Sequence, residues 1–338
     1  MGSSLPSRLV TVTGGAALLC LGTGCAWISL VATDSVAESA AVERRCAPAA
    51  PVPDSRYIRQ HAPDSESPLA QVPPALGHRF SREALLIAET IGVSDLIAQL
   101  PSLEAEAEQQ IERSAVRLLQ VRQELSDRLL LAFFDVARTA AEADCEEERA
   151  DQLADRLQET RDRRVRTQTL IAIIGDALVG VLSGGLSLAG HETAAAAGAI
   201  SGGVLATAFG TSALFSGVQH DFRHPRNLLR EVWEAPDEPT LIPRSVWRFL
   251  NRPLADDPEG RSLRETLISR WRQHGRLGEP SSDTEQRRIA LFFGEGGLYE
   301  IEELRARAAM LDLLEADVNL MSQDLERLLQ EILASRAP

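Results

Sequence analysis

The feature that most constrains this chain is a long stretch without helix-breaking residues. From Leu103 to about Arg166 the sequence contains neither proline nor glycine. Apolar residues recur along it in steps typical of one helix face, at Ile111, Leu118, Val121, Leu125, Leu129, Ala132, Val136, Leu153 and Leu157. This spacing predicts an amphipathic α-helix, which extends about 95 Å if it is unbroken.

A second long helix is predicted near the C-terminus, from about Tyr299 to Leu333. Its apolar residues follow a heptad-like pattern that Glu315 and Ser322 interrupt: Ile301, Leu304, Ala308, Leu311, Val318, Leu325, Leu329 and Ile332. We expect the two helices to pack together as an antiparallel coiled-coil-like pair. Aromatic residues make up only 4% of the chain, which suits helices better than β-sandwiches.

The predicted fold class is all-α, with long antiparallel coiled-coil-like helices, a Gly/Ala-rich apolar helical hairpin and short peripheral helices. The predicted segments are 1–37 (export signal or membrane anchor), 38–80 (Pro-rich disordered tether), 81–166 (helical region with the long amphipathic helix), 167–218 (glycine-rich apolar helical hairpin), 219–280 (short helices and loops) and 281–338 (C-terminal coiled-coil-like helix). Ser81 is the predicted N-cap of the first folded helix, and Pro101 is predicted to end that helix.

The N-terminus has the pattern of an export signal. Arg8 precedes the uncharged residues 9–33, and Asp34 follows them,. Three outcomes stay open. The signal is cleaved after Ala37, or it is retained as an anchor because the run is long enough for a bilayer core of about 30 Å, or Cys25 is lipidated. The expected localisation is the cell envelope, either in the periplasm or associated with a membrane.

The cysteines outside this signal are Cys46 and Cys145. One remaining pair in an oxidising compartment predicts a disulfide. It would close a loop of about 100 residues, which in the chain-entropy description stabilises the fold by about 4–5 kcal/mol. The alternative is two unrelated thiols, and mass mapping of unreduced peptides distinguishes the two.

Residues 168–218 differ from everything around them. The first half carries Asp176 as its one charged residue up to Gly190, and the second half, Thr193–Val218, carries none. Each half has about 20–25 residues, enough to span a bilayer as a helix. Gly190-His191-Glu192 predicts a turn between them. We expect Asp176 to face a partner, water or a lumen, because a carboxylate facing lipid is costly.

Small residues recur every four positions in both halves of this hairpin, at Gly180, Gly184, Gly198, Gly202, Ala206 and Gly210. This spacing lets two helix backbones approach closely. In water each glycine costs a helix up to about 1 kcal/mol relative to alanine, so these residues are expected to pack against something. Three interpretations stay open: a hairpin in a membrane, a hairpin buried in a soluble bundle, and glycine-zipper self-association between chains.

The charges around the hairpin give two conflicting orientations. Arginines flank it on one side, at 161–166 before it and at 223–230 after it, and the positive-inside rule makes that side cytoplasmic. The N-terminal signal places the same side outside. The conflict disappears if the hairpin inserts after export or stays packed in protein.

No arrangement of Ser, Cys, His or carboxylate residues indicates a catalytic site. We therefore predict that the chain is not an enzyme, that it has no catalytic, cofactor-binding or metal-binding residues, and that it uses no cofactor or small-molecule substrate. The formal charge of −14 argues against a nucleic-acid partner, because phosphate binding requires a basic face.

Several features have a structural interpretation beside a functional one. His220 and His224 are four positions apart, so on a helix they can share a metal, but a structural pair is the expectation. The acidic stretch 142–159 is expected to be a solvated helix face, with a cation site as the alternative. The glycines of 294–297 predict a loop. The following tryptophans are expected to be core anchors, with a membrane interface as the alternative: Trp233, Trp247 and Trp271.

These observations favour an exported, envelope-associated helical protein whose hairpin inserts in or assembles at a membrane, in a pore-like or scaffold role. The order of long helix, apolar hairpin and long C-terminal helix is similar in architecture to helical pore-forming toxins of the cytolysin type. The alternative is a soluble periplasmic or secreted scaffold that binds a partner protein through its coiled coil. The expected partners are a membrane and either a second copy or another helical protein.

Export is the first expectation that an experiment can test. Residues 1–80 fused to a reporter that is active only outside the cytoplasm should give activity, because the N-terminal signal directs translocation. The same fusion without residues 1–37 serves as the control and should be inactive. An expressed but inactive fusion of residues 1–80 would remove the argument for an oxidising compartment.

Overall fold

The computed structural model describes residues 46, 74–109, 112–188, 217–254 and 257–335. Its chain divides into two compact units, residues 1–47 and 48–338, and all elements below belong to the second. The regular elements of the described residues are helices apart from one two-stranded sheet, so the fold is all-α. The shorter helices are α4 Pro74–Gly77, α5 Arg82–Thr90, α6 Ser94–Glu108, α9 Leu228–Glu234, α10 Arg244–Asn251, α11 Leu263–Gln273 and α12 Asp283–Phe293.

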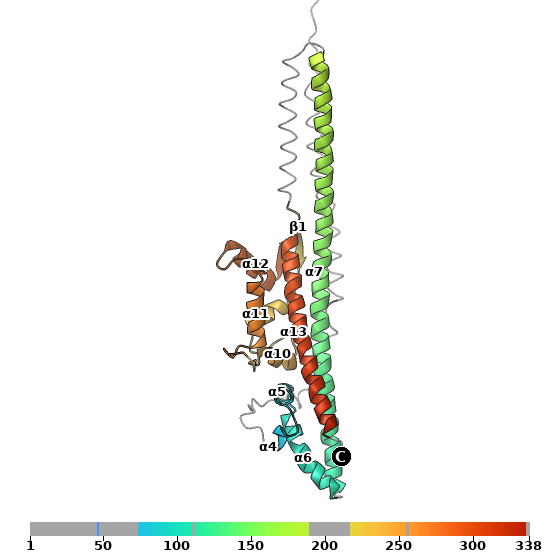
Figure 1. Cartoon of the computed structure of the whole chain (residues 1–338), viewed down its shortest axis with the longest axis vertical. Helices are drawn as coiled ribbons and strands as arrows, with labels where there is room; N and C mark the ends of the chain where they lie inside the picture. Colours follow the sequence, from blue (N-terminus) through green and yellow to red (C-terminus); the bar gives the residue numbers. More distant parts are fainter. Residues whose placement is uncertain (1–45, 47–73, 110–111, 189–216, 255–256, 336–338) are drawn as a thin grey trace, which may run out of the picture. The chain divides into compact units, whose positions relative to one another are not determined.

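The long helix α7 runs from Glu112 to Leu188, 77 residues in all, and is the longest ribbon in Figure 1. The predicted long helix is therefore confirmed, but it does not end near Arg166. It continues through the first half of the predicted hairpin, because that half has no proline and extending a helix costs less than nucleating a new one. The predicted boundary between residues 166 and 167 is therefore not a break in the backbone.

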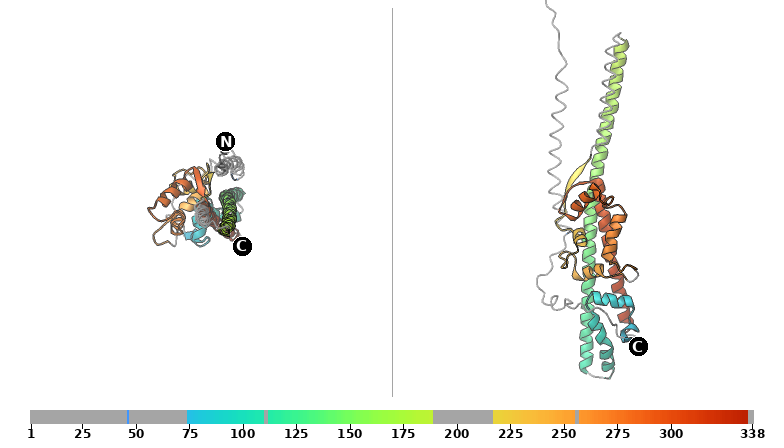
Figure 2. Two further views of the ribbon diagram at one scale, coloured as in Figure 1. Left: turned by 90° about the horizontal axis from the view of Figure 1, so that it is seen from above. Right: turned by 90° about the vertical axis from the view of Figure 1, so that its left-hand side faces the viewer.

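The C-terminal helix α13, Ile301–Ala334, lies antiparallel along α7 (Figures 1 and 2). Both helices bury their apolar faces against each other, with Leu304 and Leu311 of α13 and Ala150 and Ala154 of α7 almost fully buried. Small alanines on α7 let the two backbones come close along this stretch. The predicted pairing of the two long helices is confirmed.

The residues that α13 buries differ from the predicted heptad pattern by one position at every second contact. Leu314, Met321 and Leu328 are fully buried where the predicted pattern has Glu315, Ser322 and Leu329. Both rows share the buried positions Leu311, Val318, Leu325 and Ile332. The helix is rotated so that it buries leucine and methionine rather than Glu315 and Ser322, because apolar burial stabilises the pair and burial of a carboxylate opposes it.

The N-terminal helices confirm Ser81 as an N-cap, but the prediction that Pro101 ends the first helix is wrong. The Ser81 side chain accepts a hydrogen bond from the amide of Ala84 at 3.2 Å, as expected for an N-cap. The chain turns at Gly92, which has a φ of 70°, and Pro101 lies inside α6. Glycine adopts this left-handed conformation without the Cβ penalty. Packing of α6 against the core outweighs the hydrogen bond lost at Pro101.

A short sheet was not predicted. Strand β1, Gln219–Arg223, pairs antiparallel with β2, Gly296–Glu300, so the helical arrangement considered for the histidines is wrong. Of the glycines predicted to form a loop, Gly296 and Gly297 begin β2 instead, whereas Gly294 lies in the loop between α12 and β2. Gly296 has a φ of 94°, and a Cβ there would lie 2.2 Å from the Phe222 carbonyl oxygen. Five-residue strands carry too short a pattern for periodicity to identify.

Helices α10 and α11 pack on α13, and α9 packs against α12, around a tryptophan core. Trp271 is fully buried and Trp247 nearly so. The Trp233 ring stacks on Phe293 with centroids 4.3 Å apart. The interpretation of the tryptophans as core anchors is therefore confirmed, since aromatic rings contribute large apolar area to such a core.

The pairing of α13 with α7 predicts the effect of two matched substitutions on α13. Leu314→Ala removes a fully buried side chain and should lower the free energy of unfolding by about 2–5 kcal/mol. Leu320→Ala is the control, because Leu320 is 42% exposed and should cost less than about 1 kcal/mol. Urea denaturation followed by circular dichroism measures both. Equal costs would contradict the packing of α13 described here.

Candidate functional site

The last part of α7 presents large apolar side chains to solvent. Five of them are between 50% and 74% exposed: Leu170, Ile171, Ile173, Ile174 and Val181. We call these five residues the apolar end of α7. In Figure 1, α7 continues well past the N-terminal end of α13. Burying one such side chain contributes about 1.5–3 kcal/mol, so a row of them marks a surface that fits an apolar partner or a membrane.

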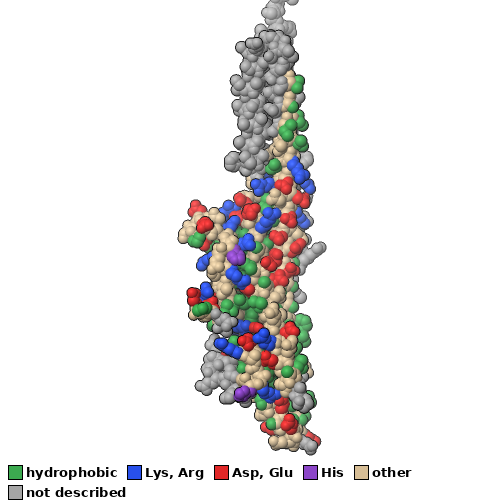
Figure 3. Space-filling model, in the orientation of Figure 1, with side chains coloured by type: hydrophobic (Ala, Val, Ile, Leu, Met, Phe, Trp, Pro, Cys, Tyr) green, Lys and Arg blue, Asp and Glu red, His purple; other side chains and the backbone are tan. Residues whose placement is uncertain are grey.

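Arginines precede this apolar end. The exposed ones are Arg161, Arg163, Arg164 and Arg166. Figure 3 shows basic side chains gathered where the apolar part of α7 begins. Arginine at the boundary between an apolar and a polar stretch is typical of side chains that lie at the level of lipid headgroups.

A clamp of polar and aromatic contacts joins α7 to β1, the two elements that flank residues 189–216. The Arg149 guanidinium of α7 donates to the Arg223 carbonyl of β1 and pairs with Glu146 at 2.8 Å. It also lies 4.3 Å from the centre of the Phe222 ring. We call Glu146, Arg149, Phe222 and Arg223 the basal clamp. A buried, hydrogen-bonded guanidinium of this kind holds both elements in one position.

Arg307 lies fully buried beside the clamp. Its Nη1 donates to the Phe292 carbonyl at 3.0 Å, and its Nη2 lies 3.9 Å from Glu146 Oε2. Burial lowers the pKa of this guanidinium, whereas Tyr299 and Glu146 act in the opposite direction. The buried charge is stabilised by these partners, because an unpaired charge at this depth is very costly.

His224 and Tyr299 form a second buried contact at the same end of the bundle. The Tyr299 hydroxyl donates to the Leu291 carbonyl at 2.9 Å, and the His224 Nε2 lies 2.8 Å from the same hydroxyl. Tyr299 has one hydroxyl hydrogen, so His224 must be the donor in the second bond. Burial, reinforced by Arg307, lowers the pKa of His224 to about 2. The ring is therefore neutral, and His224 is the structural histidine that was expected.

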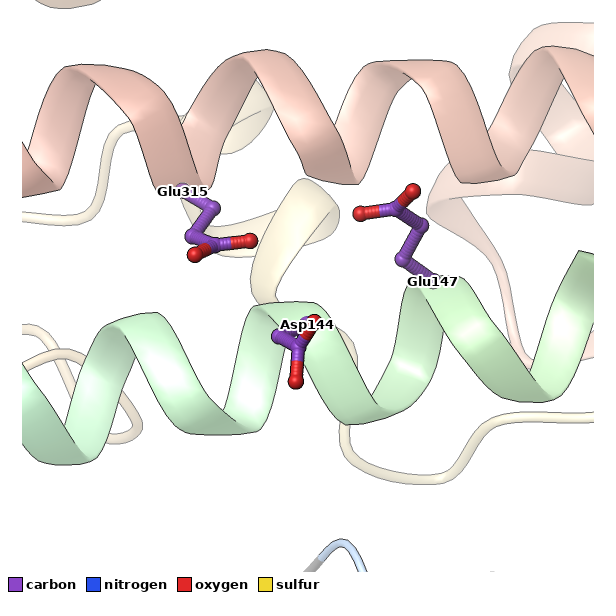
Figure 4. Close-up of side chains that lie close together, drawn as sticks. All are labelled: Asp144, Glu147 and Glu315. Carbon is purple, nitrogen blue, oxygen red and sulfur yellow. The ribbon is translucent and has the colours of Figure 1, made fainter.

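Three carboxylates meet across the α7–α13 seam (Figure 4). Oxygens of Asp144 and Glu147 on α7 and of Glu315 on α13 all lie within 4.8 Å of one another. Burial raises the pKa of Glu147 to about 7, and Asp312 and Asp151 add to the shift. Carboxylates of this kind can ligate hard cations, but they are equally explained as crowded acids on a helix seam. We assign them an electrostatic role only.

The prediction of a solvated acidic face is wrong in part. Glu142 and Glu146 are buried, and Glu142 accepts two hydrogen bonds from Arg226 at 2.8 and 3.2 Å. Both residues lie on the side of α7 that faces the body of the protein. The exposed acids of the same stretch, such as Glu148, do form a solvated face.

The structure describes only some of the predicted site residues of the hairpin and only some of the cysteines. Gly180, Gly184 and Asp176 lie on α7, and their side chains are outside the described part. The residues wholly outside it are Cys25, Gly198, Gly202, Ala206 and Gly210. Cys145 is half-buried on α7 and Cys46 is buried. They belong to different compact units, so their disulfide stays a prediction.

The helices were also compared with what a bilayer span requires. Where side chains are described, no single helix combines the necessary length and apolarity. Helices α5 and α6 together reach the length and apolarity of a bilayer span, but only as a pair bent by 119°.

Comparison with known proteins adds nothing to the assignment. The chain matches no protein-family model, no curated protein and no solved structure. Its function is therefore argued from its own residues.

Sequence reasoning missed the residues of the clamp and its surroundings. Arg307 occupies the same helical row as Leu314 and Met321, and a charged residue in an apolar row is a signal of a buried ion network. Glu146 similarly continues the buried row of α7. The partners β1 and β2 carried no comparable signal, because their pairing joins residues 70 or more positions apart.

The raised pKa of Glu147 predicts a pH-dependent stability. The folded value of about 7 exceeds the ordinary glutamate value of about 4.3. The folded state therefore binds the proton more tightly, and stability falls as pH rises through this window. Glu147→Gln should raise the melting temperature by roughly 1–4 °C at pH 8 and by little at pH 4. Glu326→Gln, an exposed carboxylate elsewhere on α13, is the control. An equal effect of Glu147→Gln at both pH values would contradict this account.

Proposed function

We propose that this chain is an exported, envelope-associated helical protein that uses residues 168–218 to insert in, or assemble at, a membrane. The observation that carries the proposal is the apolar end of α7, with five large apolar side chains at least half exposed. In water this surface is costly, so it implies an apolar surrounding in the working state.

The length and the charges of this region support a membrane as that surrounding. From Arg166 to Leu188 the helix rises about 33 Å, close to the bilayer core of about 30 Å. The arginines of 161–166 are placed for the headgroup region, with the apolar end beyond them,.

The basal clamp joins the two elements that flank the proposed membrane segment, which supports insertion of the segment as one unit. The chain enters the segment along α7 and returns at β1. Arg149 holds both elements within one network, so the base of the segment has a defined geometry. The glycine spacing from Gly198 to Gly210 then offers a close helix contact within the segment or between copies.

The remaining parts of the proposal come from the sequence. The N-terminal signal provides export, with its processing left open among cleavage, anchoring and lipidation at Cys25. The predicted Cys46–Cys145 disulfide fits an oxidising compartment. No feature of the described residues calls for catalysis, and we propose a role in assembly, pore-like or as a scaffold.

A soluble scaffold is the second candidate. It is favoured by exposed apolar residues at the other end of α7, since Val116 is 56% and Leu119 is 65% exposed. Such a row on a long helix fits a helical protein partner.

Two matched double variants of α7 separate these candidates. Ile173→Gln with Ile174→Gln alters residues that are 60% and 57% exposed, and Val116→Gln with Leu119→Gln alters residues of similar exposure far from the hairpin. If the apolar end contacts lipid, the first pair should lower retention on carbonate-washed membranes at least about five-fold, because glutamine is costly in hydrocarbon. The second pair should leave retention unchanged.

Both variants should retain the melting temperature of the wild type, because all four residues are exposed. Residues 1–37 should be absent from all the proteins compared, so that an N-terminal anchor does not mask the result. Unchanged retention of the first variant, or loss in both, would refute the membrane role of the apolar end.

A further inference from the structure

The arginines that precede the apolar end of α7 lie just beyond the body of the protein. Helix α13 runs antiparallel to α7, and its Arg305 pairs with Asp155 at 3.6 Å. Because α13 begins four residues before Arg305, it extends along α7 only to about residue 159. Strand β1 begins at the same level, since Gln219 pairs with Glu300, the residue before α13. The arginines therefore occupy the stretch of α7 between the body and the apolar end.

Two of the three acids beside these arginines already have partners. Asp155 pairs with Arg305, and Glu159 pairs with Arg163 at 3.2 Å. Asp162 has no ion pair with another described residue. Among the described residues, no ion pair or hydrogen bond engages the guanidinium groups of three arginines, which we call the basic cluster: Arg161, Arg164 and Arg166.

The basic cluster carries an excess of positive charge. Arg161 and Arg164 have no acid three or four positions away in either direction, and these are the positions that a helix places beside them. Arg166 has Asp162 four positions before it. All three arginine side chains are exposed. From residue 159 to residue 175, four arginines outnumber two acids, so the local net charge is +2 in a chain whose formal charge is −14.

We propose that the basic cluster binds the phosphate groups of anionic phospholipids, and that the protein therefore inserts preferentially in membranes with a negative surface. The guanidinium group suits this role because it stays charged and can donate two parallel hydrogen bonds to phosphate oxygens. A phosphatidylcholine headgroup offers the same phosphate, but its own ammonium group neutralises it. The inference rests on the proposed membrane role of residues 168–218 and adds the class of lipid that this region recognises.

The distances favour attraction over repulsion at such a surface. The basic cluster lies about 3–10 Å beyond residue 159 along α7. Exposed acids of the body near that level, Asp221 and Glu302, are therefore farther from the headgroups than the arginines are. The Debye length at physiological salt is about 8 Å, so screening weakens the repulsion of these acids more than the attraction of arginines at the headgroups. Each arginine close to an anionic surface strengthens binding about five-fold.

Partition between two kinds of vesicle tests this preference. The full chain is floated with vesicles of phosphatidylcholine, and with vesicles of phosphatidylcholine and phosphatidylglycerol in equal amounts. The readout is the ratio of the two partition coefficients, because a contribution of residues 1–37 that is independent of lipid charge cancels in this ratio. We expect the anionic vesicles to bind more than about ten-fold better at physiological salt, and less than about two-fold better at about 1 M salt.

Two matched triple variants locate the preference. The first neutralises the basic cluster and should lower the ratio to less than about two-fold: Arg161→Gln, Arg164→Gln and Arg166→Gln. The control changes the net charge equally at three exposed arginines of α5 and of the first turns of α7, and should keep the wild-type ratio: Arg82→Gln, Arg113→Gln and Arg117→Gln. Both variants should retain the melting temperature of the wild type, because all six side chains are exposed.

Inorganic phosphate distinguishes lipid headgroups from free phosphate as the ligand. At equal ionic strength, phosphate should lower binding to the anionic vesicles no more than chloride does. Stronger competition by phosphate, equal binding to both kinds of vesicle, or an equal effect of the control variant would overturn the proposal. Equal binding would leave the proposed membrane role in place, whereas no binding to either kind of vesicle would remove that role and this inference together.

Discussion

The antiparallel contact between α7 and α13 is the interaction on which the rest of the structure depends. Each helix has an apolar face that water disfavours, and most of the stability of such helices comes from packing rather than propensity. The two partners are unequal, with 77 residues in α7 and 34 in α13. The shorter helix cannot cover the longer one, so part of α7 must find its apolar surroundings elsewhere.

The end of this contact is fixed by a buried polar network rather than by more apolar packing. Arg307 is fully buried among Asn227, Phe292 and Glu146. A buried guanidinium adds little net stability, but it tolerates few alternative arrangements because its partners must be in place. The network sets where α7 leaves the bundle and where β1 re-joins it.

The uncovered part of α7 follows from these unequal lengths. Its large apolar side chains are at least half exposed, and lipid or an apolar protein surface can remove them from water. The arginines that precede them fit the headgroup region of a membrane,.

Much of this organisation is determined by the sequence itself. The stretch from Leu103 to Arg166 without proline or glycine predicts the long helix, and apolar spacing predicts its partner, because helical periodicity is a local property. Tertiary structure decided the rest. It buried Leu314 rather than Glu315, carried α7 past Arg166, and brought β1 to β2. Each of these depends on contacts between distant residues, and their free energies exceed the local preferences that a sequence pattern records.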